Sequence, residues 1–209
     1  MKFYDCKTAP SPRRVRVFLA EKGIELDTIQ VDLASGEQLG DAFKAINPDC
    51  DDPVLQLDDG QCITEVVAIC SYIEALHPEP ALMGETPADK AAVLMWNAKI
   101  EQQGLFAMAD AFRNSAPGLK DRALPGPDAY PQIPELAARG RQRVERFRRR
   151  MEERLAECTY VAGDFFSMAD ITALVFVDFA AWIKIPLPDD ATNMARWYGA
   201  VSQRPSAKA

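Results

Sequence analysis

The sequence predicts an α/β domain followed by an all-helical domain, and two features of its pattern carry this prediction. Strand and helix signals alternate through about the first 80 residues in the order βαβαββα, which is typical of a small domain with helices packed on a mixed sheet. Beyond a proline-rich segment the strand signals disappear, and only helical patterns remain. We therefore expect a first domain over residues 1–79, a linker over 80–87 and an all-helical domain over 88–209.

The α/β domain is expected to begin with the short strand KFYD. A helix over Pro12–Lys22 follows, with apolar residues at helical spacing and Gly23 as a favourable C-terminal cap. The segment DTIQVDL alternates like a strand, and GEQLGDAFKAIN is typical of a short helix that Pro48 stops.

A β-hairpin and a helix complete this domain. The apolar runs PVLQL and QCIT flank the turn Asp58-Asp59-Gly60, which is a strong hairpin signal. Residues Glu65–Leu76 then predict an amphipathic helix that ends at His77, just before a proline.

The second domain is expected to contain a long helix over 88–114, interrupted near Gly104, and an irregular proline- and glycine-rich connection over 116–134. Further helices are predicted over 139–155, 168–183 and 193–203. The first of these is rich in arginine, but its apolar residues recur on one face and its glutamates interleave with the arginines, which indicates a solvated outer face. The apolar positions are Val144, Phe147, Met151 and Leu155.

The segment GDFFSMADI contains a helix-starting signal. Ser167 and Asp170 have the spacing of an N-terminal capping box, and Phe166 is placed to pack across it as a hydrophobic staple. The helix that follows is apolar nearly all round, so we expect it to be the buried central helix of the domain.

Composition excludes several classes of function. The net charge of −7 argues against nucleic acid as a partner, and no apolar run approaches the roughly 20 residues of a membrane span. A single histidine, His77, nearly excludes mechanisms that need a histidine base or several histidine ligands. The five cysteines form no CxxC pair, and the N-terminus lacks the apolar core of a signal peptide, so a cytoplasmic location is expected.

Several motifs in order resemble the glutathione S-transferase family. They are the frame NP…PVLQLDDG…ITE…AI..YIE within Asn47–Glu74, AEKGIE, GDFFSMADI and NMARWYGAVSQRPSA. The resemblance spans essentially the whole chain. It implies a thioredoxin-like N-terminal domain, an all-α C-terminal bundle, a homodimer, an active site between the domains, glutathione as co-substrate, and detoxification of small-molecule electrophiles.

The resemblance also assigns cofactor-binding residues. Pro53 matches the family's cis-proline, and the preceding Asp52, where valine is usual, exposes its main chain to the peptide's cysteinyl unit. Glu65 matches the acid before the third helix, and Val66 stands where the family has a serine that holds the γ-glutamyl carboxylate. The carboxylates of Asp51 and Asp52 either oppose this anionic ligand or point into solvent.

The group that activates the thiol is less defined. The family's nucleophilic cysteine position falls on Ala9, so Ser11, Thr8 or nearby amides are the expected donors to the thiolate. An alternative for Ser11 is a plain helix cap before Pro12, and Cys6 is expected to be buried at a strand end.

For the electrophile pocket we expect Trp96 and Phe112, although aromatic residues at helical spacing more often lie in a core. No metal site is predicted, because no later ligand completes a calcium loop after Asp49–Asp52. Three readings remain: a glutathione transferase, a protein of this fold that has lost glutathione, and an enzyme whose acidic pocket takes an amine-bearing ligand.

Overall fold

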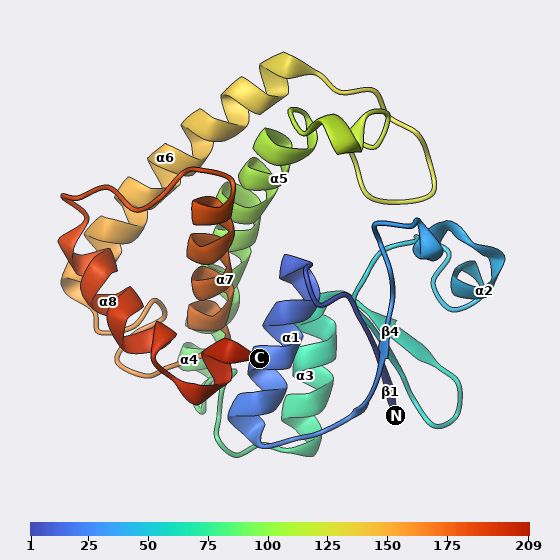
Figure 1. Ribbon diagram of the computed structural model, residues 1–209. Helices are drawn as coiled ribbons and strands as arrows, with labels where there is room; N and C mark the ends of the chain where they lie inside the picture. The colour runs from blue at the N-terminus through green and yellow to red at the C-terminus, as the bar shows by residue number, and fades with distance from the viewer. The chain divides into compact units, whose positions relative to one another are not determined.

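The computed structural model describes residues 1–209 and divides them into two compact units (Figure 1). The first unit comprises Met1–Pro80 with the short segments Pro125–Asp128 and Lys208–Ala209, and the second comprises Ala81–Leu124 and Ala129–Ala207. None of the helices combines the length and apolarity that crossing a bilayer requires.

The first unit is built on a mixed four-stranded sheet, as predicted. Its strands are β1 (Lys2–Asp5), β2 (Asp27–Gln30), β3 (Val54–Gln56) and β4 (Cys62–Thr64), in the order β2-β1-β3-β4. Strand β1 runs parallel to β2 and antiparallel to β3, and β3 and β4 form the predicted hairpin. Gly60 adopts a φ of 91° in the hairpin turn, a conformation that favours glycine.

Two helices of this unit, α1 (Pro10–Lys22) and α3 (Val66–Leu76), pack against each other (Figure 1). Lys22 ties their ends together, because its ammonium group pairs with the Glu74 carboxylate and donates to the carbonyls of His77 and Pro80. His77 caps the C-terminus of α3, which confirms the predicted helix end.

Two local predictions in this unit are wrong. Helix α1 starts at Pro10 with Ala9 as its N-cap, so Ser11 lies inside the first turn and does not cap the helix. The segment predicted as one short helix is divided at Gly40, whose extended backbone separates a 3-10 helix (Glu37–Leu39) from α2 (Asp41–Lys44). Glycine is a poor helix former, so it breaks the helix there.

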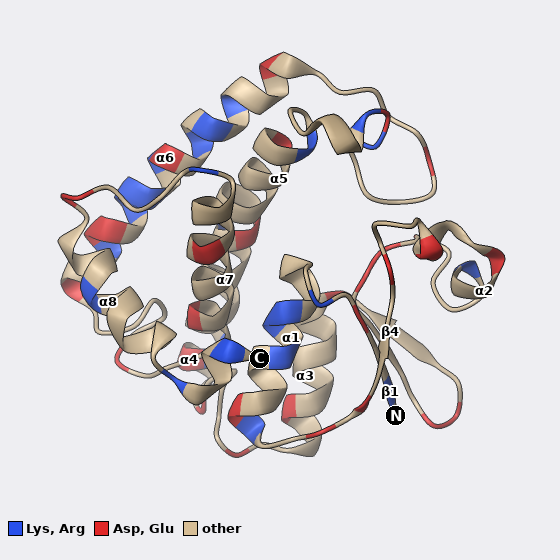
Figure 2. Cartoon of the chain, viewed as in Figure 1, with Lys and Arg blue, Asp and Glu red and all other residues tan.

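The second unit is helical, as predicted. Its elements are α4 (Pro87–Ile100), a π-helix (Glu101–Leu105), α5 (Phe106–Arg113), α6 (Pro134–Glu157), α7 (Met168–Trp182) and α8 (Thr192–Ser202). The predicted apolar face of α6 is buried, and its arginines and glutamates lie along the rest of the helix (Figure 2). Most of α7 is buried, which confirms it as the central helix.

Close helix contacts explain two glycines of this unit. The predicted interruption near Gly104 is the π-helix, and a Cβ at this residue would meet the rings of Phe147 and Phe176 at 3.1 Å. At Gly140 a Cβ would meet the backbone oxygen of Ala107 at 2.5 Å, so α5 and α6 approach each other through this glycine.

The capping box of α7 is confirmed, and Asp170 does more than cap. Its fully buried carboxylate accepts hydrogen bonds from the backbone N–H groups of Ser167 and Val161 and from Trp197 Nε1. The ring of Phe166, the predicted staple, packs edge-on against Tyr160, and the Arg204 guanidinium carbon lies 4.0 Å from its centroid.

Candidate glutathione site

The candidate site lies at the ends of β1 and β3 beside the first turn of α1. Tyr4 of β1 pairs with Val54 of β3 in an antiparallel register. Continuing that register by two residues places Asp52 across from Cys6. The strand order therefore brings the acidic residue before Pro53 to the loop that leads into α1.

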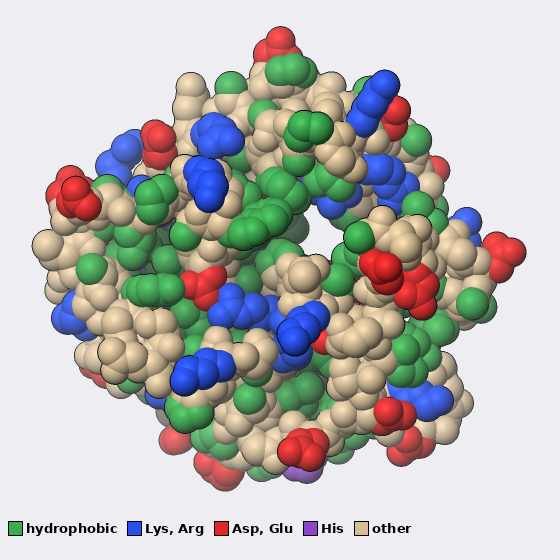
Figure 3. Space-filling view, viewed as in Figure 1, with side chains coloured by type: hydrophobic (Ala, Val, Ile, Leu, Met, Phe, Trp, Pro, Cys, Tyr) green, Lys and Arg blue, Asp and Glu red, His purple; other side chains and the backbone are tan.

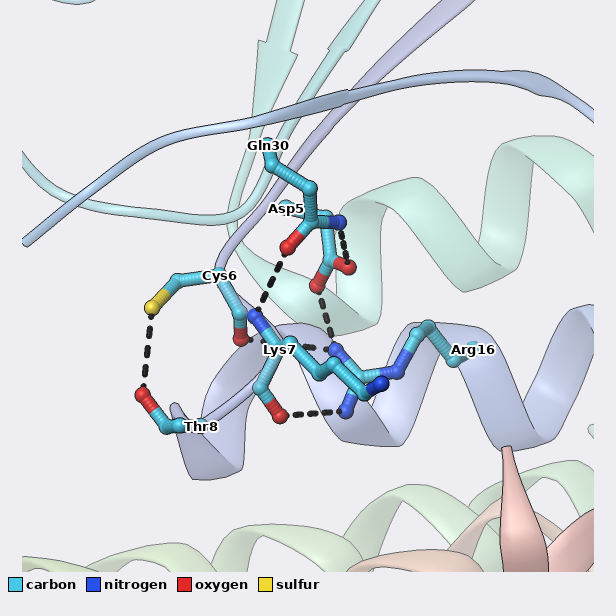
Figure 4. A network of polar contacts seen from close by, with 6 residues as sticks. All are labelled: Asp5, Cys6, Lys7, Thr8, Arg16 and Gln30. Atoms are coloured by element: carbon cyan, nitrogen blue, oxygen red, sulfur yellow. Dashed lines mark hydrogen bonds and ion pairs between the residues drawn. The ribbon is translucent and has the colours of Figure 1, made fainter.

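The loop after β1 is fixed by a polar network around Asp5 (Figure 4). The guanidinium of Arg16 pairs with Asp5 and donates to the carbonyls of Cys6 at 3.4 Å and Lys7 at 3.0 Å. Gln30 Nε2 donates to Asp5 Oδ2 at 2.5 Å, and the Lys7 N–H donates back to Gln30 Oε1 at 3.1 Å. Asp5 and Arg16 thus pair with each other, and Arg16 also binds the loop through the carbonyls of Cys6 and Lys7.

Both predicted thiol donors lie on this fixed loop or at the start of α1. Thr8 is exposed, and its Oγ1 lies 3.5 Å from the buried thiol of Cys6, as Figure 4 shows. Ser11 Oγ accepts a hydrogen bond from Arg14 Nη2 at 3.3 Å, which leaves the hydroxyl proton of Ser11 free to donate. The burial of Cys6 is as predicted.

Asp52 has a main chain that can receive an extended peptide. The Asp52–Pro53 bond is cis, and the pairing of β3 with its neighbours begins only at Val54. Neither the N–H nor the C=O of Asp52 takes part in a backbone–backbone hydrogen bond, and the N–H contacts only the residue's own carboxylate. Unpaired groups at the end of a strand are the usual partners of an added peptide strand.

The side chain of Asp52 does not behave as a solvated loop acid, so that alternative is wrong for this residue. Its Oδ2 atom is buried and has no hydrogen-bond partner. Burial raises its pKa to about 7, against the lowering effect of a hydrogen bond from its own backbone N–H. The charges of Asp51 and Asp5 raise the pKa further, and Arg16 lowers it. The carboxyl group therefore titrates close to neutral pH.

Asp51 has a different environment. Asn47 Nδ2 donates to its Oδ1 at 2.8 Å and to its backbone oxygen at 2.9 Å. Burial raises the pKa of Asp51, and the hydrogen bond from Asn47 opposes this effect. Asn47 thus holds the loop that carries both acids.

Glu65 and Val66 form the second part of the site. Glu65 is exposed and has a φ of 68°, which is unusual for a residue other than glycine and is found most often at functional sites. The first hydrogen bond of α3 runs from the Ile69 N–H to the Glu65 carbonyl. The N–H groups of the first turn, starting at the buried Val66, therefore point out of the helix N-terminus, where they favour an anion.

Trp96, predicted to line the electrophile pocket, is 7% exposed. Cations from α4 and α6 surround its ring: Lys99 Nζ lies 4.5 Å from the centroid, and the guanidinium carbons of Arg154 and Arg150 lie at 5.2 and 5.9 Å. The ring therefore makes cation–π contacts with side chains of its own unit.

Phe112 belongs to an aromatic cluster that the sequence reasoning did not find. Its ring meets Phe179 at 5.7 Å and Trp182 at 5.0 Å, and these two stack on each other at 5.4 Å. Trp182 is 62% exposed, and apolar side chains remain visible over the upper part of α7 (Figure 3). The i, i+3 spacing of two aromatic residues at the end of an apolar helix was the available signal.

No group of histidine, cysteine, aspartate and glutamate side chains is arranged to hold a metal ion. The first unit offers a strand end without backbone pairing, a helix N-terminus, two hydroxyl groups and the carboxyl group of Asp52, whose pKa is raised to about 7.

Both halves of the chain match models of known protein families. Residues 8–76 match the family model "Glutathione S-transferase, N-terminal domain", and residues 104–205 match "Glutathione S-transferase, C-terminal domain". Glutathione S-transferase 2 of Saccharomyces cerevisiae is 38% identical over 210 residues, which cover 100% of this chain and 88% of that protein. Glutathione S-transferase F9 of Arabidopsis thaliana is 28% identical over 95% of this chain and 90% of its own length.

Solved structures of this family are similar to the whole chain. Gtt2 from Saccharomyces cerevisiae superposes with a TM-score of 0.91 at 37% identity and covers 100% of this chain and 99% of its own. A glutathione S-transferase domain-containing protein from Marinobacter aquaeolei VT8 also reaches a TM-score of 0.91, at 34% identity over 99% of both chains. The predicted thioredoxin-like domain and helical bundle are thereby confirmed, and the chain belongs to the glutathione S-transferase family.

Proposed function

We propose that this protein is a glutathione transferase that adds glutathione to, or removes it from, a small apolar electrophile. The observation that carries the proposal is the main chain of Asp52, which makes no hydrogen bond to another backbone group and lies beside the cis-Pro53 just before β3. Such an edge suits the cysteinyl unit of the tripeptide, which can exchange two backbone hydrogen bonds with it.

The remaining contacts follow from the same geometry. The exposed Glu65 carboxylate pairs with the ligand's amine, and the N–H groups that begin at Val66 bind the γ-glutamyl carboxylate. Thr8 and Ser11 donate hydrogen bonds to the sulfur. Val66 has no hydroxyl, and one missing charge-assisted hydrogen bond weakens binding by roughly ten- to a hundredfold.

The electrophile is proposed to contact aromatic side chains of the second unit. Phe112 is the stronger candidate, because its cluster includes the exposed ring of Trp182. Trp96 is the weaker one, because cations cover its ring. We further propose a cytoplasmic homodimer with a role in detoxification, and neither nucleic acid nor membrane as a partner.

Calorimetric titration with glutathione tests the proposal. The native protein is expected to bind in the micromolar to low-millimolar range, and a Val66→Ser, Asp52→Val double variant more tightly. If the double variant binds glutathione and the native protein does not, the protein has kept the fold of the binding site but has lost glutathione binding.

A second candidate function rests on the paired acids Asp51 and Asp52, which favour a cationic group. In that case the protein uses the same edge for an amine-bearing ligand. Titration with a glutathione analogue whose glycyl carboxylate is amidated separates the two: tighter binding of the less anionic analogue supports the second function.

A further inference from the structure

Three positive charges gather around the ring of Trp96 in the second unit, and the proposed function gives them no role. They belong to Lys99 of α4 and to Arg150 and Arg154 of α6. The ammonium nitrogen of Lys99 lies 4.5 Å from the ring centroid, and the two guanidinium carbons lie at 5.9 and 5.2 Å. We call these three side chains and the ring the Trp96 cation cluster.

The charges of this cluster are largely unneutralised. Arg150 and Arg154 are four residues apart on one helix, a spacing at which like charges destabilise each other. Burial lowers the pKa of Lys99, and the charges of the two arginines lower it further. Arg154 pairs with the exposed Glu157 at 3.7 Å, whereas neither Lys99 nor Arg150 forms an ion pair. The repulsion therefore has little compensation in the protein alone.

Neutral groups hold the two guanidinium groups in place. Arg150 Nη1 donates to Gln103 Oε1 at 3.2 Å, and Arg154 Nε donates to the Val161 carbonyl at 3.0 Å. The ring of Trp96 adds a cation–π contact to each. A neutral acceptor fixes the position of a guanidinium group and leaves its charge in place. The cluster is therefore an ordered set of cations.

Another arginine of α6 shows the alternative arrangement. Arg143 lies two turns before Arg150, and its guanidinium pairs with the Asp110 carboxylate at 3.2 Å. An acid from the neighbouring helix thus neutralises Arg143, and no acid does this for Arg150. The difference indicates that the missing negative charge at the cluster comes from outside the chain.

The donors of the cluster suit a phosphate or sulfate group. A guanidinium group presents parallel N–H donors that match two oxygens of such a group, and a lysine ammonium group adds a compact charge. Arg150 uses one of its five N–H donors on Gln103, so the others remain for a ligand. Three cations match one doubly charged group, and the net charge of −7 argues against a nucleic acid as its source.

We propose that the Trp96 cation cluster binds the phosphate or sulfate group of a small molecule, at a site that does not depend on glutathione. The oxygens of the group accept hydrogen bonds from Lys99 Nζ and from free N–H groups of Arg150 and Arg154. Binding removes the repulsion among the three cations, and it replaces the long contact between Arg154 and Glu157. No covalent bond forms or breaks.

Titration with inorganic phosphate at about pH 8, followed by phosphorus NMR, tests the proposal. The native protein is expected to bind phosphate saturably, and Arg150→Gln should weaken binding about tenfold, because one charge-assisted contact is lost. Lys99→Gln should weaken it to a similar extent. Arg149→Gln is the matched control: it removes the same charge from an exposed neighbour on α6 that faces another direction, and it should change the affinity by less than about twofold.

Thermal unfolding provides a second readout. A ligand that binds only the folded state raises its stability, so phosphate should raise the Tm of the native protein and of Arg149→Gln, and much less that of Arg150→Gln. Phenyl phosphate and inorganic sulfate identify the source of the group. Roughly tenfold tighter binding of phenyl phosphate indicates an organic phosphate ester, and equal affinities indicate that a free ion suffices.

Three outcomes would overturn the proposal. The first is absence of saturable phosphate binding, and the second is equal weakening by all three variants, which would show only general attraction of an anion. The third is a change from dimer to monomer in Arg150→Gln, measured by light scattering, without phosphate binding by the native protein. The cations would then face a second copy of the chain. Circular dichroism shows that each variant is folded, and glutathione binding is expected to be unchanged in all of them.

Discussion

Replacing Asp52 by asparagine should make the free energy of unfolding less dependent on pH. Burial raises the pKa of Asp52 from 3.8 to about 7 in the folded chain. A carboxyl group with a raised pKa favours the folded state only while it is protonated. Its contribution is therefore complete below about pH 4 and is lost as pH rises to about 7.

The size of the effect follows from the interval between the two pKa values. The interval is about 3 pH units, and each unit corresponds to about 1.4 kcal/mol, so the native protein loses about 4 kcal/mol of unfolding free energy across this range. Asparagine keeps the shape of the side chain and does not ionise. The stability of Asp52→Asn relative to the native protein should therefore increase by about 4 kcal/mol between acidic and alkaline conditions.

Urea unfolding, followed by circular dichroism, measures this difference at about pH 4.5 and about pH 8. Asp49→Asn should give the same small difference at both pH values, because that acid is exposed. A difference between Asp52→Asn and the native protein that stays constant with pH would refute the reasoning. It would mean that the carboxyl group of Asp52 is solvated in the folded protein.

Three further outcomes are expected. Gly140→Ala should lower the free energy of unfolding by about 1–3 kcal/mol or more, because its Cβ would meet the Ala107 oxygen at 2.5 Å. Gly199→Ala should raise the free energy of unfolding by up to about 1 kcal/mol, because its Cβ would meet nothing within 4 Å. Thermal unfolding compares the two variants. Val66→Ser alone should tighten glutathione binding roughly ten- to a hundredfold in calorimetry, and unchanged affinity would show that a hydroxyl at this position makes no contact. Asp170→Ala should cost about 3–5 kcal/mol in chemical unfolding, because it leaves four buried donors without their acceptor. A loss under about 1 kcal/mol would contradict that network.

The fold was predictable because local signals agreed with tertiary structure. The hairpin at Gly60, the capping box at Ser167 and the apolar stripe of α6 each depend on a few neighbouring residues. Element boundaries were harder to predict where the sequence fits two alternative starting residues. Pro10 and Pro12 both suit the first turn of a helix, and only the structure shows that α1 starts at the earlier one.

The sequence predicted backbone features of the candidate site, namely the cis bond before Pro53 and a helix that begins beside Glu65, and it did not predict the electrostatics. The family pattern located Pro53, Glu65 and Val66, because these depend on backbone geometry that the fold imposes. The surroundings of Trp96 and Phe112 are set by residues that are distant in the chain, namely the arginines of α6 and Trp182 of α7. A pattern confined to one helix does not contain that information.

Asp52 shows why the departure from the family pattern was ambiguous in the sequence. A carboxylate in place of valine suggests repulsion of an anionic peptide if the group is ionised, and a usable proton acceptor if it titrates near neutrality. The choice depends on the burial of one oxygen atom and on Asp5 and Arg16, which the sheet and α1 bring near it. Because Arg16 is bound to Asp5, it leaves Asp52 largely uncompensated. The sequence alone therefore does not decide the charge of Asp52, which the burial of its carboxyl group sets.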